Sequence, residues 1–442
     1  MSARRLLVLL LLLAAIGIPA GVLQVLCVGS SCDAGTFETP RVPFCPLPEA
    51  TKELIVNGYR EGRSPDVMGV TDGITVWSSA GGIGLRAPWP GGPSGSKSVP
   101  LAFAGAGVST EAVVPDGATL DRVAPTVAGA LGFERPFPEV RSGTAIEAVL
   151  GGTGALPRLV VLVGWKGIGT AELERRPEDW AFLASLLHDG AGTLEADVGS
   201  LPVDPAAVLT TIGTGGLPSQ HGITGSVVRN DDGEIVPAFG EGSPVQIVAT
   251  LADDLEGAER RTLVGLVATD PSDGGIVGGG WYPDQDPIDR IIGDAGAAPL
   301  AVRTLLEVGF GSDEIPDVVG VVLDGSVRAL DRRTHAIVTA VERAAGGSAL
   351  VVVAGTGSPA SDRPAVPARD LVRSVEAAVP GEQPVVAATV PGGLFLDQEG
   401  LARAEIAGQA VVDALLDVSA PNGERMMADA FQGFAVSFAR YC

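Results

Sequence analysis

The chain has 442 residues, of which 46% are hydrophobic, so it can bury a large core and is not a disordered chain. Its formal net charge of −23 argues against nucleic acid as a partner, because affinity for nucleic acid rests on clustered Lys and Arg that release counterions. Acidity of this size otherwise reports solubility and names no mechanism.

The N-terminal segment, residues 1–32, has the pattern of an export signal. Arg4 and Arg5 precede an uncharged run from Leu6 to Val28, and positive residues before an apolar core direct a chain to the translocation machinery. The run is long enough to span a bilayer, which favours a retained anchor, while small residues towards its end permit cleavage as a signal peptide. We therefore expect an exported protein that is either membrane-anchored or secreted.

Cysteine usage supports the same location. Cys27 lies in the apolar run, which leaves Cys32, Cys45 and Cys442 for the exported part. Two of these three can form a bridge that ties the start of the folded domain to its last residue, provided that the chain ends are neighbours. We favour Cys45 with Cys442, and a free terminal thiol is the alternative.

Residues 33–46 are Pro-rich and polar, which is typical of a surface linker, and the main domain is expected over residues 47–442. The first part of this domain contains a helix and a short strand over residues 47–71. The segments over residues 99–108 and 120–132 follow.

From Arg158 onwards, short apolar runs alternate with amphipathic segments, and the runs are rich in Val, as strands buried on both faces should be. This pattern predicts an α/β fold with a mainly parallel central sheet flanked by helices. The expected strands span residues 158–163, 262–268, 317–323, 349–355 and 384–390, and the expected helices span residues 178–189, 325–345, 366–378, 399–416 and 424–440.

One stretch, residues 197–225, carries a recognisable motif. It reads DVGSLPVDPAAVLTTIGTGGLPSQHGITG and contains Thr214-Gly215 and a later Pro-Ser-Gln-His-Gly-Ile run. The stretch resembles the nucleophile segment of the alkaline-phosphatase superfamily, especially its nucleotide pyrophosphatase and phosphodiesterase branch. The resemblance implies an alkaline-phosphatase-like fold, in which Thr214, Gly215, His221 and Gly222 have a structural role in closing the turn.

The opening half of the motif departs from that family. Where the family has a Thr or Ser nucleophile, the possible alignments place Val203, Asp204 or Pro205, none of which carries an alcohol that can attack phosphorus. Thr210 and Thr211 are the nearest hydroxyls, and we expect both inside the following helix.

Three segments near the front of the chain resemble parts that usually come late in this family. They are the Gly-Tyr and Gly-Arg-Ser-x-Asp-Val of residues 58–67, the Val-Pro-Leu strand with Gly-x-Gly at residues 99–107, and the Ala-Pro-Thr of residues 124–126. Their position implies a circular permutation, with residues 47–150 as the moved segment and residues 151–442 as the half with the nucleophile motif. Permutation is tolerated when native termini lie close together.

The positions of the family's metal ligands are also altered. Ligands of open parallel sheets lie beyond the carboxyl ends of the strands, and there Lys166 stands in place of the first metal-binding Asp. An ammonium repels a divalent cation instead of binding it. Gly355 and Thr356 replace the Asp and His of a late Asp-His-Gly, and Ser98 replaces the His before Val-Pro-Leu.

The histidine content gives a second argument about metals. Paired catalytic zinc ions need several imidazoles, whereas His188, His221 and His335 are the only histidines and have no metal-ligand spacing. The loop at residues 309–325, where the resemblance leads us to expect an Asp-x-x-x-His, holds acidic residues but no His. We therefore expect no metal cofactor, with zinc or another divalent metal as the alternative.

Two questions stay open at this stage. Lys166 either pairs with a nearby carboxylate such as Asp204 and restores the charge balance, or its ammonium holds an anion beside the helix N-terminus near Ala206. Trp281 and Tyr282 either line a ligand surface or are packing residues beside a run of glycines.

These observations favour an exported alkaline-phosphatase-like protein that has lost its metals and nucleophile and acts in binding or scaffolding at the cell surface. Its partner would be an unidentified protein or envelope component, and the N-terminal segment, if uncleaved, would add membrane contact. The alternative is a metal-dependent phosphoester or phosphodiester hydrolase with a carboxylate-rich site. In that case Asp204 and acids of residues 313–324 are the candidate ligands.

Overall fold

We describe the protein from a computed structural model, in which a compact unit spans Pro43–Cys442. The predicted export segment, residues 1–32, lies outside the described residues. No helix among the described residues is long and apolar enough to cross a membrane. The structure describes residues 42–80, 85–91, 96–151, 156–259, 261–283, 288, 290–293, 295–358, 364–379, 384–420 and 423–442.

An eight-stranded, mainly parallel sheet forms the centre of the unit, as the sequence predicts. Its Val-rich middle strands pair in parallel, and Val161 lies opposite both Val319 and Val351. Among the strands of this sheet, only β4 runs antiparallel to both of its neighbours. In spatial order the strands are β11 (Arg290–Ile292), β10 (Val264–Val267), β12 (Asp317–Leu323), β6 (Leu159–Trp165), β13 (Ala349–Gly355), β4 (Ser98–Gly105), β7 (Ala191–Asp197) and β5 (Ala112–Val113).

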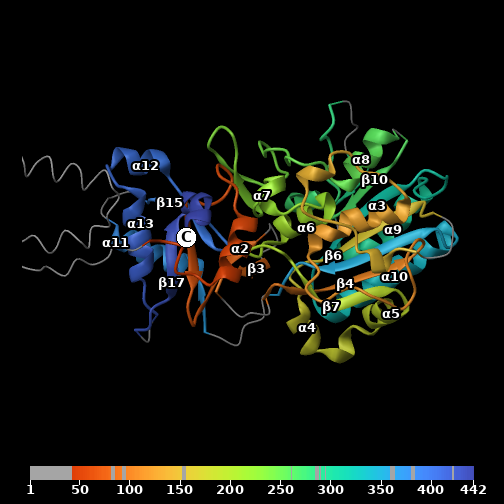
Figure 1. Ribbon diagram of the computed structural model, residues 1–442, viewed down its shortest axis with the longest axis horizontal. Helices are drawn as coiled ribbons and strands as arrows, with labels where there is room; N and C mark the ends of the chain where they lie inside the picture. The colour runs from red at the N-terminus through yellow and green to blue at the C-terminus, as the bar shows by residue number, and fades with distance from the viewer. Residues whose placement is uncertain are drawn as a thin grey trace, which may run out of the picture. The chain divides into compact units, whose positions relative to one another are not determined.

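Helices cover both faces of this sheet (Figure 1). Alternate side chains of each strand point to opposite faces, so Val160 and Leu162 pack with one helix layer while Val161 and Val163 pack with the other. The first layer consists of α3 (Val123–Leu131), α6 (Pro205–Thr214) and α8 (Leu251–Ala258), and the second of α5 (Ala181–Asp189), α9 (Ala298–Glu307) and α10 (Val327–Ala345).

A four-stranded antiparallel sheet packs against α11 (Ala368–Ala378) and α13 (Gly408–Asp417) in a separate core. It joins the two ends of the compact unit, because β1 pairs with β16 and β17 from the C-terminal part. Its strands in spatial order are β15 (Val386–Val390), β16 (Gly393–Leu396), β1 (Val67–Thr71) and β17 (Met427–Gln432).

Three predicted elements differ in the structure. The closing helix over residues 424–440 is wrong, because β17 forms an edge of the antiparallel sheet and only a 3₁₀ segment, η9 (Gly433–Tyr441), follows it. The strand expected at residues 384–390 lies in the antiparallel sheet and not in the central one. The helix expected over residues 399–416 is interrupted between Arg403 and Gly408.

The remaining elements lie at the borders of these layers. They are α2 (Glu49–Gly58), α4 (Thr170–Glu174), α7 (Pro218–His221), α12 (Gln398–Arg403), the 3₁₀ segments η3 (Leu120–Arg122), η4 (Pro138–Val140), η5 (Glu147–Val149), η6 (Pro177–Asp179), η7 (Pro271–Ile276) and η8 (Ala295–Ala297), the sheet of β14 (Ala365–Pro367), β2 (Thr75–Ala80) and β3 (Leu85–Pro88), and the hairpin of β8 (Val227–Arg229) and β9 (Ile235–Pro237).

A disulfide joins Cys45 and Cys442, the pair favoured from the sequence, with Cα atoms 5.1 Å apart. The linker predicted over residues 33–46 ends earlier than expected, because the compact unit already begins at Pro43. Phe44 is fully buried, and its ring meets Phe431 edge to face at 5.2 Å. The first and last residues of the compact unit are therefore held together by both packing and a covalent bond.

Candidate functional site

Lys166 lies at the carboxyl edge of the central sheet. It follows β6 directly, and its backbone N–H donates to the carbonyl of Leu323 at the end of β12 (2.8 Å). Its side chain is 1% exposed, and its Nζ lies 2.6 Å from Oδ1 of Asp273 and 4.0 Å from Oδ2 of Asp270. A buried ammonium thus occupies the edge of the sheet where such folds usually bind ligands.

The segment η7 places the two aspartates beside Lys166. Asp270 caps η7, since its side chain accepts from the backbone N–H of Ser272 (3.0 Å), and Pro271 at the first position suits a helix start. Asp273 lies within η7, and burial raises the pKa of its carboxyl to about 6, although Lys166 acts in the opposite direction. The ion pair is therefore enclosed in a place that penalises charge.

Asp204 lies at the N-terminus of α6 and contributes a third carboxylate. Its Oδ1 accepts from the backbone N–H of Ala206 (3.0 Å) and from Oγ of Ser226 (2.7 Å), and Pro205 opens the helix. Its Oδ2 has no hydrogen-bond partner among the described protein atoms. Burial raises the pKa of the Asp204 carboxyl. Asp204, one of the three residues that the resemblance aligns with the nucleophile, therefore acts as a helix cap.

The ion pair decides between the two hypotheses for Lys166. A carboxylate does neutralise the ammonium, but the direct partner is Asp273 and not Asp204. Asp204 instead caps α6, where its Oδ1 accepts from the backbone N–H of Ala206 and from Ser226. With its side chain 1% exposed, Lys166 presents no open surface to an anion in solution.

The other altered positions meet at the same edge and have structural roles. Thr356 is fully buried, and its Oγ1 accepts from the backbone N–H of Gly167 (2.9 Å). A Cβ on Gly355 would come within 2.3 Å of the Ile168 carbonyl oxygen, so no larger residue fits there. Val203 is buried, and Ser98 opens β4 opposite Asp197.

The closing half of the motif forms the turn at the far end of α6. Gly215 and Gly222 have φ angles of 77° and 80°, the left-handed conformation that ends a helix. Thr214 is fully buried and bonds the carbonyl of Thr210 one turn earlier (2.7 Å).

His221 is enclosed in the same turn. Its Nδ1 accepts from the backbone N–H of Ile223 (3.2 Å), and its Nε2 lies 3.1 Å from Oγ1 of Thr211. Burial lowers the pKa of the imidazole to about 3, so His221 is neutral at physiological pH. Thr210 and Thr211 lie inside α6, as expected.

Most of the carboxylates suggested for an alternative metal site lie far from Asp204. Asp317 opens β12 at its amino end, where its side chain accepts from the backbone N–H groups of Leu263 and Gly311 (both 2.7 Å). A seven-residue strand spans roughly 20 Å, and Asp313 and Glu314 precede it. Asp313, Glu314 and Asp317 therefore lie at the opposite edge of the sheet from Asp204, whereas Asp324 follows β12 at its carboxyl end.

The donor set around Lys166 does not fit paired zinc ions. In the described part of the chain, no group of three or more His, Cys, Asp or Glu side chains could hold a metal ion. His188 is exposed at the end of α5, and His335 stacks on Phe182 with ring centroids 4.4 Å apart. Lys166 itself supplies the charge that a metal would bring.

Sequence reasoning missed Asp270 and Asp273, which are the residues that pair with Lys166. The signal was present, because both follow the expected strand at residues 262–268 within a few positions. The family resemblance instead points to the loop at residues 309–325.

Comparisons with known proteins find distant matches in structure alone. No protein-family model and no curated protein matches the chain. Among solved structures, the chain is similar to wild-type alkaline phosphatase PafA, with 14% identity and a TM-score of 0.43 over 64% of this chain and 85% of that chain. A mutant of alkaline phosphatase PafA gives 13% identity and a TM-score of 0.42 over 64% and 86% of the two chains.

Proposed function

We propose that this chain is an exported alkaline-phosphatase-like protein without a phosphoesterase centre, which acts in binding or scaffolding at the cell surface. The observation that carries the proposal is the buried ion pair of Lys166 with Asp273, 2.6 Å apart at the carboxyl edge of the sheet. A metal ion at this place would have to displace an ammonium that is already neutralised. In addition, Asp204 at the nucleophile position cannot form an ester with phosphorus as an alcohol does.

Circular permutation of a superfamily scaffold is part of this proposal. Two observations support it: the Cys45–Cys442 disulfide brings the chain ends together, and β4 from the front of the chain pairs with β13 from the later part. Joined ends are the condition under which a permuted chain keeps its fold. The disulfide also supports export, because disulfides persist in oxidising compartments.

The test is metal content together with activity, measured on the purified full chain. Elemental analysis for zinc and other divalent metals would accompany assays on p-nitrophenyl phosphate and bis-p-nitrophenyl phosphate, with and without a chelator. We expect metal well below one equivalent and the same background rate in wild type and in Lys166→Ala. Stoichiometric zinc with turnover that a chelator abolishes would contradict the proposal and restore the hydrolase alternative.

A phosphate titration tests whether Lys166 retains an anion site. Melting temperatures of wild type and Lys166→Ala would be followed against added inorganic phosphate. We expect the same small response in both proteins, because the ammonium is enclosed. A stabilisation by phosphate that is specific to wild type would contradict the closed centre.

A further inference from the structure

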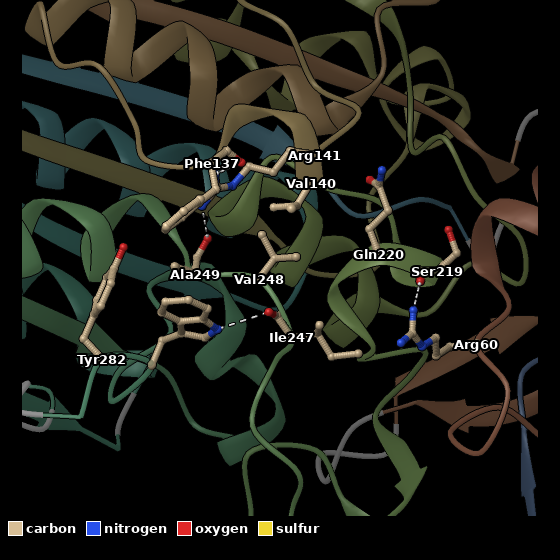
Figure 2. A pocket seen from close by; sticks show the side chains of 11 residues that line it. Arg60, Phe137, Val140, Arg141, Ser219, Gln220, Ile247, Val248, Ala249 and Tyr282 are labelled. Carbon is tan, nitrogen blue, oxygen red and sulfur yellow. Dashed lines mark hydrogen bonds between the residues drawn. The ribbon is translucent and has the colours of Figure 1, made fainter.

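A second site lies at the other end of α6. A pocket of about 540 Å³ opens beside α7, which follows the carboxyl end of that helix (Figure 2). The ten residues of α6 separate the pocket from Asp204 by roughly 15 Å of helix. The pocket volume is within the range of small-molecule sites, and none of its lining residues belongs to the Lys166 centre.

Exposed apolar side chains form the wall of the pocket. Phe137, Val140 and Ile247 are 59%, 44% and 40% exposed, although each is a large hydrophobic residue. Phe137 also has a φ angle of 51°, a left-handed conformation that is uncommon outside glycine. Exposed apolar side chains that line one pocket are typical of a binding site.

The aromatic part of the wall is fixed before any ligand binds. Trp281 donates its indole N–H to the carbonyl of Ile247 (3.2 Å), and Tyr282 donates its hydroxyl to Oδ1 of Asp254 (2.8 Å). The Tyr282 ring lies so close to α8 that a Cβ on Gly257 would be 3.0 Å from it. Trp281 and Tyr282 are therefore both packing residues and lining residues, so the two hypotheses for them hold together.

The charge of the pocket is opposite to that of the protein. Its lining includes Arg60 and Arg141 and no acidic residue, whereas the chain has a formal net charge of −23. Arg141 is neutralised by Asp254 (3.0 Å). Arg60 is exposed and donates to the backbone carbonyl of Ser219 (3.1 Å), and no carboxylate among the described residues pairs with it.

Figure 2 places Arg60 and Ser219 at one end of the pocket and Tyr282 at the opposite end, with Val248 and Ile247 between them. A ligand that spans the pocket would thus meet apolar surface along its body and a guanidinium at one tip. Guanidinium groups bind carboxylates through charge-assisted hydrogen bonds.

We propose that this pocket binds a small anionic amphiphile, with its apolar body against Phe137, Ile247 and Trp281 and its carboxylate on Arg60. This proposal rests on the proposed binding function and names a site and a ligand class for it. It needs no step of catalysis and no metal.

The experiment compares decanoate with decanol and decylamine, which share the alkyl chain and differ in charge. Affinities for the full chain would be measured by displacement of 8-anilinonaphthalene-1-sulfonate. We expect decanoate to bind roughly tenfold more tightly than decanol, and decylamine to bind more weakly than either. Arg60→Gln should remove the preference for decanoate and leave the affinity for decanol unchanged.

Matched variants separate this pocket from general surface binding. Phe137→Ala should weaken decanoate and decanol alike, roughly fivefold to tenfold, whereas Phe438→Ala, which removes a ring that is 56% exposed on η9, should change neither. Arg403→Gln is the control for charge, since its side chain is 74% exposed elsewhere. All variants contain the apolar residues 1–32, so any ligand binding by that segment is the same in each. Differences in affinity between variants therefore report binding in the pocket.

Equal affinity for decanoate and decanol in wild type would overturn the proposal, as would equal losses in Phe137→Ala and Phe438→Ala. The outcomes are independent of the metal and activity assays. Stoichiometric zinc with turnover would refute the proposed function but not the ligand proposed for the pocket. Equal binding of decanoate and decanol by wild type would refute only the ligand proposed for the pocket.

Discussion

The two ends of α6 handle charge in opposite ways. At its amino end, Lys166 is buried near Asp204, Asp270 and Asp273, and its ammonium pairs directly with Asp273. At its carboxyl end, the exposed guanidinium of Arg60 stands next to apolar side chains and has no acidic partner among the described residues. The buried ion pair stabilises the folded state, whereas the exposed guanidinium is available to bind a ligand. The comparison predicts that changes to the buried Lys166 ion pair alter stability and that changes to the exposed residues lining the pocket alter binding.

The largest effect is expected from His221, next to the pocket end. Its folded pKa of about 3 lies below the ordinary value of 6.5, so its stabilising contribution is complete above pH 6.5 and is lost as pH falls. The full contribution of His221 to the free energy of unfolding is about 5 kcal/mol, and about 3 kcal/mol of it is lost when the pH falls to about 4. In urea unfolding across this range, the stability of wild type should fall more steeply towards acid than that of His221→Asn. His188→Asn, which alters an exposed ring, should follow wild type.

The next effect concerns Lys166. Lys166→Met should lower the free energy of unfolding by roughly 3–5 kcal/mol, because it leaves buried carboxylates without their cation. Lys52→Met is the control, since its partner Glu49 is 87% exposed, and should cost within about 1 kcal/mol. Adding Asp273→Leu to Lys166→Met should recover much of the loss, and simple additivity of the two losses would show that the ion pair does not couple them.

Asp273 should give a smaller pH effect of opposite sign. Its folded pKa of about 6 lies above the ordinary 3.8, so its contribution is complete below pH 3.8 and falls by about 3 kcal/mol as pH rises through 6. The difference in unfolding free energy between wild type and Asp273→Asn should therefore fall between about pH 4 and pH 7. A constant difference over that range would mean that the carboxyl is not shielded from water.

The smallest stability effects are expected at the pocket. Arg60→Gln and Phe137→Ala should each change the free energy of unfolding by no more than about 0.5 kcal/mol, because both side chains are exposed. Their effect should be on ligand affinity. If either variant lost as much stability as Lys166→Met, the predicted difference between the two ends of α6 would be wrong.

Much of the central sheet was predictable from local pattern. Val-rich runs gave β6, β12 and β13 nearly to the residue, since strands buried on both faces need unbroken apolar sequence. The antiparallel sheet was harder, because β17 pairs with β1 across more than 300 residues and its sequence has a helix-like mix of Ala, Met and Phe. Such long-range pairing overrides local propensity.

The candidate site was predictable only in part. The rule that ligands lie after parallel strands located Lys166, but the partner of its ammonium depends on how η7 folds back, which no local signal fixes. The pocket was less accessible still, because Arg60, Phe137 and Ile247 come from segments that are far apart in the sequence. Only the adjacent Trp281 and Tyr282 stood out.

The bond between Cys45 and Cys442 closes nearly the whole folded unit into a covalent ring, because the two half-cystines have a sequence separation of 397. A protease that nicks one exposed loop inside this ring releases no fragment, because both pieces stay attached through the bridge. Loss of its parts would therefore require two cuts, or one cut and a reductant.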